Sequence, residues 1–197
     1  MTLHRRHFLR STAITVAGSG IVAAIPMELL ASIRKRVPFS DQIRVGLIGC
    51  RGQGWSNLTA ILKISEVQCV ALCDVDQNVL AQRKTELEKI NNKPIIYSDY
   101  RKLLQNKDID VVIIGTPDHW HCLMMCEAVA AGKDVFVEKP AANSILEAQL
   151  MTAAAKKYNK VVQVGQWQRS QQHFQDAIAF VRSGKLGKIN STKAWMY

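Results

Sequence analysis

Short apolar runs alternate with longer amphipathic segments along most of the chain after residue 42. The apolar runs are rich in β-branched residues, which is typical of strands buried on both faces of a parallel sheet. In the segments between them, apolar residues recur at helical spacing. The predicted strands are Arg44–Ile48, Gln68–Cys73, Pro94–Tyr97, Val111–Gly115, Asp134–Val137 and Val161–Val164. The predicted helices are Ser56–Ile64, Gln77–Ile90, Asp99–Gln105, His121–Ala131 and Ile145–Tyr158.

The alternation of strand and helix predicts the fold class. It indicates an α/β protein with a Rossmann-type doubly wound parallel sheet over residues 43–165. Signals at helix ends support these boundaries. Ser144 and Glu147 form a capping box, Lys156 and Lys157 suit the negative end of the same helix, and Gly132 stands where a helix should end.

The rhythm of the pattern changes after residue 165. Gln171–Ser183 has helical spacing and is followed by Gly184, and Lys188–Tyr197 alternates as a strand does. The last segment is either an edge strand or part of a second domain that begins here. We expect residues 166–197 to be the incomplete start of a C-terminal α+β substrate domain.

The first residues of the chain resemble an export signal. Arg5-Arg6 with Phe8-Leu9 precedes a short apolar run from Ala13 to Ile25, which is typical of a twin-arginine leader. We therefore predict a signal segment over residues 1–31, a linker over residues 32–42 and a periplasmic protein. A disordered basic tail is the alternative, and an uncleaved leader would anchor the protein to the membrane.

The positive charge of the chain does not indicate nucleic-acid binding. The formal net charge is +10, but half of this excess lies in residues 1–36, where Glu28 alone opposes the basic residues Arg5, Arg6, Arg10, Arg34, Lys35 and Arg36. The remaining lysines are scattered and form no stripe with aromatic residues. We expect no nucleic-acid partner.

The five cysteines form no pattern of disulfides or metal ligands. They contain no C-x-x-C motif, and Cys69 and Cys73 fall on one predicted strand, too far apart to be bridged. We interpret the cysteines as apolar filling of the core.

A glycine-rich turn directly follows the first predicted strand. Gly49, Gly52 and Gly54 would let the backbone turn tightly and approach a pyrophosphate at the amino end of the next helix. Arg51 occupies the middle glycine position of the usual fingerprint. A structural glycine turn is the alternative interpretation of this loop on its own.

An acidic residue ends the second predicted strand. Asp74 follows Gly54 at the offset where a carboxylate hydrogen-bonds the hydroxyls of the adenosine ribose. The same carboxylate would repel a 2′-phosphate, which favours NAD over NADP as the cofactor. The alternative is that Asp74 or Asp76 is the N-cap of the next helix.

Two further motifs follow predicted strands, at the edge of the sheet where such folds bind ligands. They are Thr116-Pro117-Asp118-His119-Trp120-His121 and Glu138-Lys139-Pro140. With these motifs the chain resembles the Gfo/Idh/MocA oxidoreductases from about Ile43 to Tyr197. The resemblance also rests on the glycine loop, Cys73-Asp74-Val75-Asp76, Val164-Gly165-Gln166-Trp167-Gln168-Arg169-Ser170 and Gly184-Lys185-Leu186-Gly187-Lys188-Ile189.

The resemblance implies roles for individual residues. Lys139 matches the lysine beside the nicotinamide and the substrate hydroxyl, so it is the expected catalytic residue, with a surface lysine as the alternative. The expected cofactor-binding residues are Gly49, Arg51, Gly52, Gly54, Asp74, Thr116, Pro117, Asp118, His121, Glu138, Gln166 and Arg169. An ion pair with a carboxylate is an equal alternative for Arg169. Pro140 is expected in a turn, where the peptide bond before it is either cis or trans.

A metal site is not expected. His119, His121, Cys122 and Cys126 are close in sequence, but on a helix they would not converge on one point, and their spacing matches no usual set of zinc ligands.

The resemblance implies an NAD(P)-dependent oxidoreductase that transfers a hydride between a sugar or polyol carbon and nicotinamide. The same family includes proteins that resemble NAD-dependent glycosidases, which is the second hypothesis. An inactive cofactor-binding fragment that needs a partner is the third. The family's substrate pocket belongs to a C-terminal domain through which its members generally form homo-oligomers.

Overall fold

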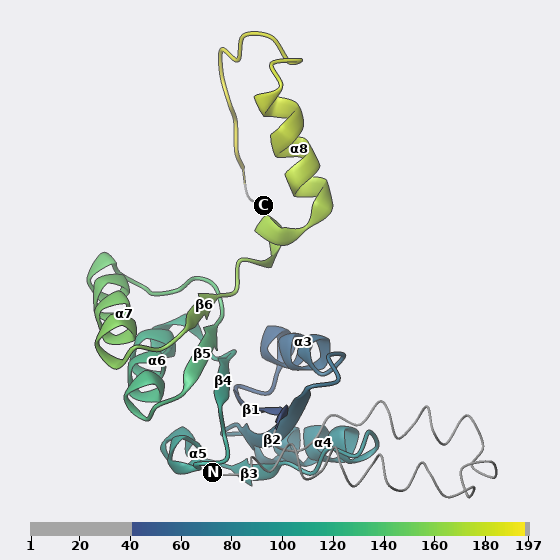
Figure 1. The fold of residues 1–197 in the computed structure, drawn as a ribbon, viewed down its shortest axis with the longest axis vertical. Helices are drawn as coiled ribbons and strands as arrows, with labels where there is room; N and C mark the ends of the chain where they lie inside the picture. The colour runs from purple at the N-terminus through teal and green to yellow at the C-terminus, as the bar shows by residue number, and fades with distance from the viewer. Residues whose placement is uncertain (1–40, 196–197) are drawn as a thin grey trace, which may run out of the picture. The chain divides into compact units, whose positions relative to one another are not determined.

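Six parallel strands form one sheet in the computed structural model, which describes residues 41–195 (Figure 1). The strands are β1 (Ile43–Ile48), β2 (Val67–Cys73), β3 (Ile95–Tyr97), β4 (Val111–Ile114), β5 (Asp134–Val137) and β6 (Val162–Val164). Their order across the sheet is β3-β2-β1-β4-β5-β6. This is the doubly wound Rossmann arrangement that the sequence predicts.

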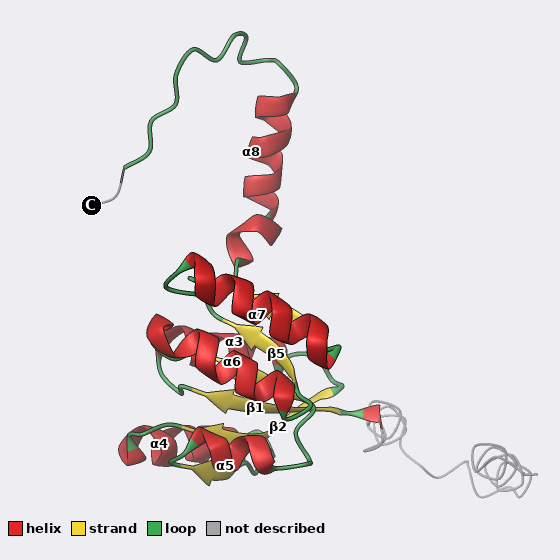
Figure 2. Ribbon diagram, turned by 90° about the vertical axis from the view of Figure 1, so that its left-hand side faces the viewer, coloured by secondary structure: helices red, strands yellow, loops and turns green. Residues whose placement is uncertain are grey.

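Helices connect the strands and cover both faces of the sheet. They are α3 (Gly52–Ile61), α4 (Gln77–Glu88), α5 (Tyr100–Gln105), α6 (His121–Ala130), α7 (Ile145–Tyr158) and α8 (Gln172–Arg182), with the 3-10 helices η3 (Asp118–Trp120) and η4 (Trp167–Ser170). Figure 2 shows α6 and α7 lying across the front of the sheet, with α3 behind it.

The side chains of the strands divide between two cores. Val45 and Leu47 of β1 belong to a cluster with Leu58 of α3 and Leu80 of α4. Ile48, the next residue of β1, belongs to a second cluster with residues of α5, α6 and α7. Successive side chains of a strand point to opposite faces. The sheet is therefore buried on both sides, which explains its continuous apolar runs.

Three of the five cysteines are core residues. Cys50, Cys69 and Cys73 are buried, and burial raises the pKa of Cys69 and of Cys73 to about 12. These two side chains are therefore neutral thiols at physiological pH. The interpretation as apolar filling is confirmed for these three, and Cys122 and Cys126 are half-buried on α6.

The connections change face between β1 and β4, which are neighbours in the sheet. β1 leads into α3 on one face, and β4 leads through η3 into α6 on the other. In such sheets the connections diverge at the carboxyl ends of the two strands and leave a crevice between them, where ligands bind.

Three glycines let the connections after β1 and β4 start side by side, because their backbones are in contact. A Cβ on Gly49, whose φ is +86°, would lie 2.8 Å from the carbonyl carbon and oxygen of Gly115. A Cβ on Gly54 would collide with the Gly49 carbonyl oxygen, and one on Gly115 would collide with the Gly54 Cα. The start of α3 therefore rests directly on the ends of β1 and β4.

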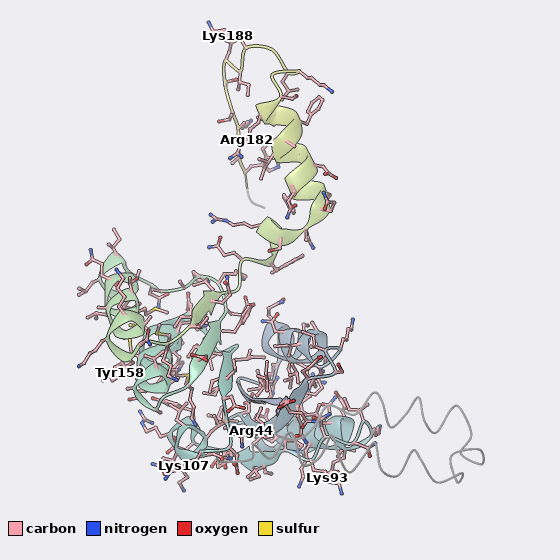
Figure 3. All side chains as sticks on the ribbon, viewed as in Figure 1. Arg44, Lys93, Lys107, Tyr158, Arg182 and Lys188 are labelled. Atoms are coloured by element: carbon pink, nitrogen blue, oxygen red, sulfur yellow. The ribbon has the colours of Figure 1, made fainter. Side chains whose placement is uncertain are left out.

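At the amino ends of the strands, an ion pair joins β1 to the segment that leads into β4. Arg44, labelled in Figure 3, donates to both carboxylate oxygens of Asp110 at 3.1 Å and to Asp108 at 2.8 Å. Its hydrogen bond to Asp110 keeps the pKa of that carboxyl below its ordinary value. The amino ends of the two strands are thus held together independently of the glycine contact.

Two predicted elements need correction. α3 begins at Gly52 instead of Ser56, because the end of the glycine loop already forms the first helical turn. The predicted strand over Lys188–Tyr197 is wrong for the part that is described, since residues 188–195 form no strand. Ile189 and Trp195 are more than half exposed. As far as it is described, this segment pairs with no strand of the sheet and is exposed along its length.

The predicted boundaries of the other helices hold closely. Ser144 caps α7 by accepting from the Glu147 amide at 3.2 Å, but the Glu147 carboxylate accepts from the amide of Asn143 instead of that of Ser144. Gly132 ends α6 with a φ of +80°.

The predicted signal segment, residues 1–31, lies outside the described residues, as does the linker up to residue 40. No helix between residues 41 and 195 is both long and apolar enough to cross a membrane.

The contact among the glycines can be tested by substitution. Gly115→Ala should lower the free energy of unfolding by about 1–3 kcal/mol, because its Cβ meets rigid backbone of Gly54. Gly46→Ala is the matched control, since its Cβ meets the side-chain ends of Ile109 and Leu103 at 3.2 and 3.3 Å, which can shift. Urea denaturation measures both. Equal stability of the two variants would contradict the account.

Candidate cofactor site

A cavity of about 650 Å³ lies at the carboxyl ends of β1, β2, β3 and β4. Four loops line it, each of which follows one of these strands. Its residues are Ile48, Gly49, Arg51, Cys73, Asp74, Val75, Asp76, Ser98, Asp99, Tyr100, Arg101, Gly115, Thr116, Pro117, Trp120 and Met124. The crevice expected from the sheet topology is therefore present as a space of ligand size.

The first turn of α3, at the end of the glycine loop, has backbone amides that no side chain caps. Arg51 is the N-cap of α3 but makes no capping bond, and the first turn of the helix contains no acidic residue. By contrast, Asp76 caps α4 and Asp99 caps α5. The positive end of the α3 dipole is therefore not neutralised by a cap, which favours the binding of an anion there.

The carboxylate of Asp74 braces the glycine loop from the neighbouring strand. Its Oδ2 accepts from the amide of Cys50 at 2.8 Å, and its Oδ1 accepts from the amide of Asp76 at 3.0 Å. The N-cap role that Asp74 or Asp76 was expected to fill belongs to Asp76, which accepts from Asn78 and Val79. Asp74 is thus free of the helix and lines the cavity.

Arg51 and Asp76 form an ion pair between the first and second of these loops. The guanidinium Nη2 donates to Asp76 Oδ2, while Oδ1 of the same carboxylate caps α4. The capping amide of Val79, and then Arg51, keep the pKa of Asp76 below its ordinary value. The arginine that replaces the middle glycine is therefore turned toward Asp76.

His121 joins the loop after β4 to the loop after β5. Its imidazole is buried, with Nδ1 at 2.7 Å from the Pro140 carbonyl oxygen and Nε2 at 2.9 Å from the Thr116 carbonyl oxygen. Carbonyl oxygens only accept, so each contact is a hydrogen bond when the ring nitrogen that faces it carries hydrogen. His121 thus positions the two loops, and it is absent from the lining of the cavity.

Glu138 is a buried carboxylate with two donors. Its Oε1 accepts from the side-chain amide of Asn57 on α3 at 2.7 Å, and its Oε2 accepts from the backbone amide of Lys139 at 3.0 Å. A Cβ on Gly165 would lie 2.6 Å from Oε1. Glu138 therefore ties the helix that follows the glycine loop to the backbone of Lys139.

The side chain of Lys139 is exposed, and the peptide bond between Lys139 and Pro140 is cis. Lys139 follows β5, one strand further along the sheet than the cavity, and does not line it. The expected catalytic residue and the expected phosphate loop are thus linked through Glu138 and Asn57.

The structure brings together only some of the expected cofactor residues. Gly49, Arg51, Asp74, Thr116 and Pro117 line one cavity. Asp118 is in η3, where its Oδ1 accepts from the amide of His119 at 2.9 Å.

Gln166 and Arg169 lie apart from that cavity and are exposed beyond β6, at η4. Among residues 41–195 no carboxylate pairs with Arg169, so the alternative role expected for it is absent from this part of the chain.

One loop of the cavity was missed by the sequence analysis. Ser98, Asp99, Tyr100 and Arg101 follow β3, and Trp120 contacts Tyr100 edge to face at 6.4 Å between ring centroids. The Arg101 guanidinium lies 4.6 Å from the centroid of the Tyr100 ring. The available signal was the third predicted strand, whose carboxyl end must reach the same edge of the sheet.

No cluster of three or more His, Cys, Asp or Glu residues suited to a metal ion occurs within the described range 41–195.

The sequence of the chain matches a known protein family over residues 43–166. That family is described as an oxidoreductase family with an NAD-binding Rossmann fold, and it is the Gfo/Idh/MocA family. A relative from Shewanella putrefaciens, named glycosyl hydrolase family 109 protein, is 33% identical over 174 residues. The match covers 80% of this chain and 38% of that relative, so the chain spans less than half of its length.

Solved structures show the same fold. Myo-inositol 2-dehydrogenase from Lactobacillus plantarum is 30% identical with a TM-score of 0.67, over 75% of this chain and 43% of the other. Scyllo-inositol dehydrogenase from Lactobacillus casei, with bound NAD(H) and scyllo-inositol, is 29% identical with a TM-score of 0.66. The superposed region again covers 75% of this chain and 43% of the other.

The link between Asn57 and Glu138 can be measured by a double-mutant cycle. Asn57→Ala and Glu138→Ala should show a coupling free energy of about 1.5–3 kcal/mol in urea denaturation, since the hydrogen bond involves a buried carboxylate. Gln53 is the control, because it donates to the Oδ1 of the same Asn57 at 3.0 Å but is exposed. The account is contradicted if the coupling free energy of Asn57 with Glu138 is no larger than that of Asn57 with Gln53. The hydrogen bond from α3 would then not stabilise Glu138.

Proposed function

The chain belongs to the Gfo/Idh/MocA oxidoreductase family, and from this premise we propose that it forms the NAD site of an enzyme that oxidises a sugar or polyol hydroxyl. The observation that carries the proposal is the uncapped start of α3 beside the cavity. The glycines there leave no Cβ between the backbone and a bound pyrophosphate.

The residues present fit a dinucleotide. Gly52 has open space around the position of a Cβ, so the first turn of α3 is accessible from outside. Asp74 has a carboxylate at the end of β2, where it would accept from the hydroxyls of the adenosine ribose. The same negative charge disfavours a 2′-phosphate, which supports NAD over NADP.

Lys139 is the residue proposed to act on the substrate. Bound NAD would accept the hydride, and the ammonium group of Lys139 would hold or relay the proton of the hydroxyl. Its backbone is fixed by Glu138, and the carbonyl of the following Pro140 by His121. These bonds place the lysine without occupying its side chain.

The proposed substrate class is a polyol such as an inositol. It is supported by the likeness to the inositol dehydrogenases, one of which holds scyllo-inositol. The name of the relative from Shewanella putrefaciens supports a second candidate, an NAD-dependent glycosidase. Net formation of NADH from free polyols distinguishes the first candidate from the second, which would release an aglycone with no net change in the cofactor.

The proposal predicts two separable properties. Calorimetry should show that the chain binds NAD, and Lys139→Met should keep the NAD affinity within about two-fold, because its side chain lies outside the cavity. NADH formation from inositols should fall by about 10²–10⁴ in the same variant. Failure of the wild-type chain to bind NAD would contradict the proposal. NAD binding without turnover by the wild type would favour the inactive cofactor-binding fragment.

We also propose that residues 1–31 direct export through the twin-arginine route to the periplasm. The proposal is supported by Arg5-Arg6 and the apolar run after it. The expected homo-oligomer and an uncleaved leader that anchors the protein stay predictions.

Export can be tested in a bacterial host with a functional twin-arginine pathway. Replacing Arg5 and Arg6 together by lysine should retain the protein in the cytoplasmic fraction, because the paired guanidinium groups are the recognised feature. Arg10→Lys is the control and should be exported as the wild type is. Equal export of all three proteins would reject the twin-arginine assignment.

A further inference from the structure

Two opposite charges meet beside the part of the cavity where an adenosine ribose would lie. Arg51 follows β1 and Asp76 follows β2, and the two side chains form an ion pair. Both residues line the cavity together with Asp74. The Arg51 side chain is 69% exposed, so it is held by its partner and not by packing.

The two carboxylate oxygens of Asp76 have different hydrogen-bond partners. Oδ1 accepts from the amides of Asn78 and Val79 at 2.9 and 3.3 Å and so caps α4. Oδ2 accepts from Arg51 and makes no bond to the cap. The ion pair can therefore be removed without removing the cap, since an asparagine retains one acceptor oxygen.

An arginine side chain that is not engaged in an ion pair is well suited to bind a phosphate. Its planar guanidinium offers paired donors that match phosphate oxygens. The 2′-phosphate that distinguishes NADP from NAD would enter next to Asp74, on the side of the cavity that Arg51 and Asp76 line. Asp76 engages the guanidinium of that arginine in an ion pair.

We propose that Asp76 determines the preference for NAD by keeping Arg51 engaged, so that this arginine is withheld from the 2′-phosphate of NADP. Asp74 repels that phosphate directly, whereas Asp76 acts through Arg51. The inference rests on the proposed function, because it concerns the selectivity of the same cofactor site. Arg51 is thereby a latent phosphate ligand.

Another cation faces the same cavity and must be distinguished from Arg51. Arg101 lies over the Tyr100 ring on the β3 side, 3.7 Å from the carboxylate of Asp99. Substitution of Arg51 in the background of the Asp76 variant separates the two arginines.

The test is Asp76→Asn, with the affinities for NADP and NAD measured by calorimetry on the full chain. The NADP affinity should rise about five-fold, the size of one exposed charge interaction gained. The NAD affinity should stay within about two-fold, because NAD has no 2′-phosphate. Adding Arg51→Gln to the Asp76→Asn variant should abolish the gain for NADP.

Asp108→Asn is the matched control. It removes the same charge from another exposed arginine–aspartate pair, that of Arg44 at the amino edge of the sheet. This variant should leave the ratio of the two affinities within about two-fold of the wild type. An equal gain for NADP in Asp108→Asn would attribute the effect to net charge and overturn the inference.

The remaining outcomes separate the inference from the function on which it rests. If NAD binds and Asp76→Asn leaves the NADP affinity unchanged, the inference is wrong and the proposed function stands. A gain that persists in the double variant also overturns the role of Arg51. If the wild type binds neither nucleotide, the proposed function fails and the inference fails with it.

Discussion

The backbone contact among Gly49, Gly54 and Gly115 is the constraint on which the site depends. It lets the first turn of α3 sit directly on the ends of β1 and β4, where the connections diverge to opposite faces of the sheet. A side chain at any of these positions would separate the helix from the strands. The contact leaves the α3 amides uncapped at the edge of the cavity, and it brings Asn57 within reach of Glu138.

The strand-end loops are held in place by bonds that cross from one strand to the next. Two interactions join the loop after β2 to the loop after β1. Asp74 accepts from the Cys50 amide, and Asp76 forms an ion pair with Arg51. His121 and Glu138 continue the chain of contacts to the loop that carries Lys139. The expected catalytic lysine does not line the cavity beside the expected phosphate loop, but these bonds make both of them parts of one connected arrangement.

The sequence alone predicts the sheet and the position of the cleft because these depend on local patterns. Apolar runs mark the strands, and the strand ends mark the loops that Gly49 and Asp74 occupy. The partners of buried polar groups are long-range and leave no local signal. The two carbonyls around His121 and the amide of Asn57 beside Glu138 become visible only in three dimensions. The predicted strand over Lys188–Tyr197 is wrong for the described residues 188–195. A strand forms only where another strand pairs with it, and alternating apolar and polar residues do not show whether such pairing occurs.

Hydrogen exchange of backbone amides with and without NAD tests the central claim, that these strand-end loops form one NAD site. NAD should slow exchange in residues 49–54, 74–76 and 116–121, and through Glu138 in the backbone of Lys139. Residues 106–110, at the amino edge of the sheet with Asp108 and Asp110, should exchange at the same rate in both states. If NAD slowed exchange in none of these loops, or only in residues 106–110, the account would be contradicted.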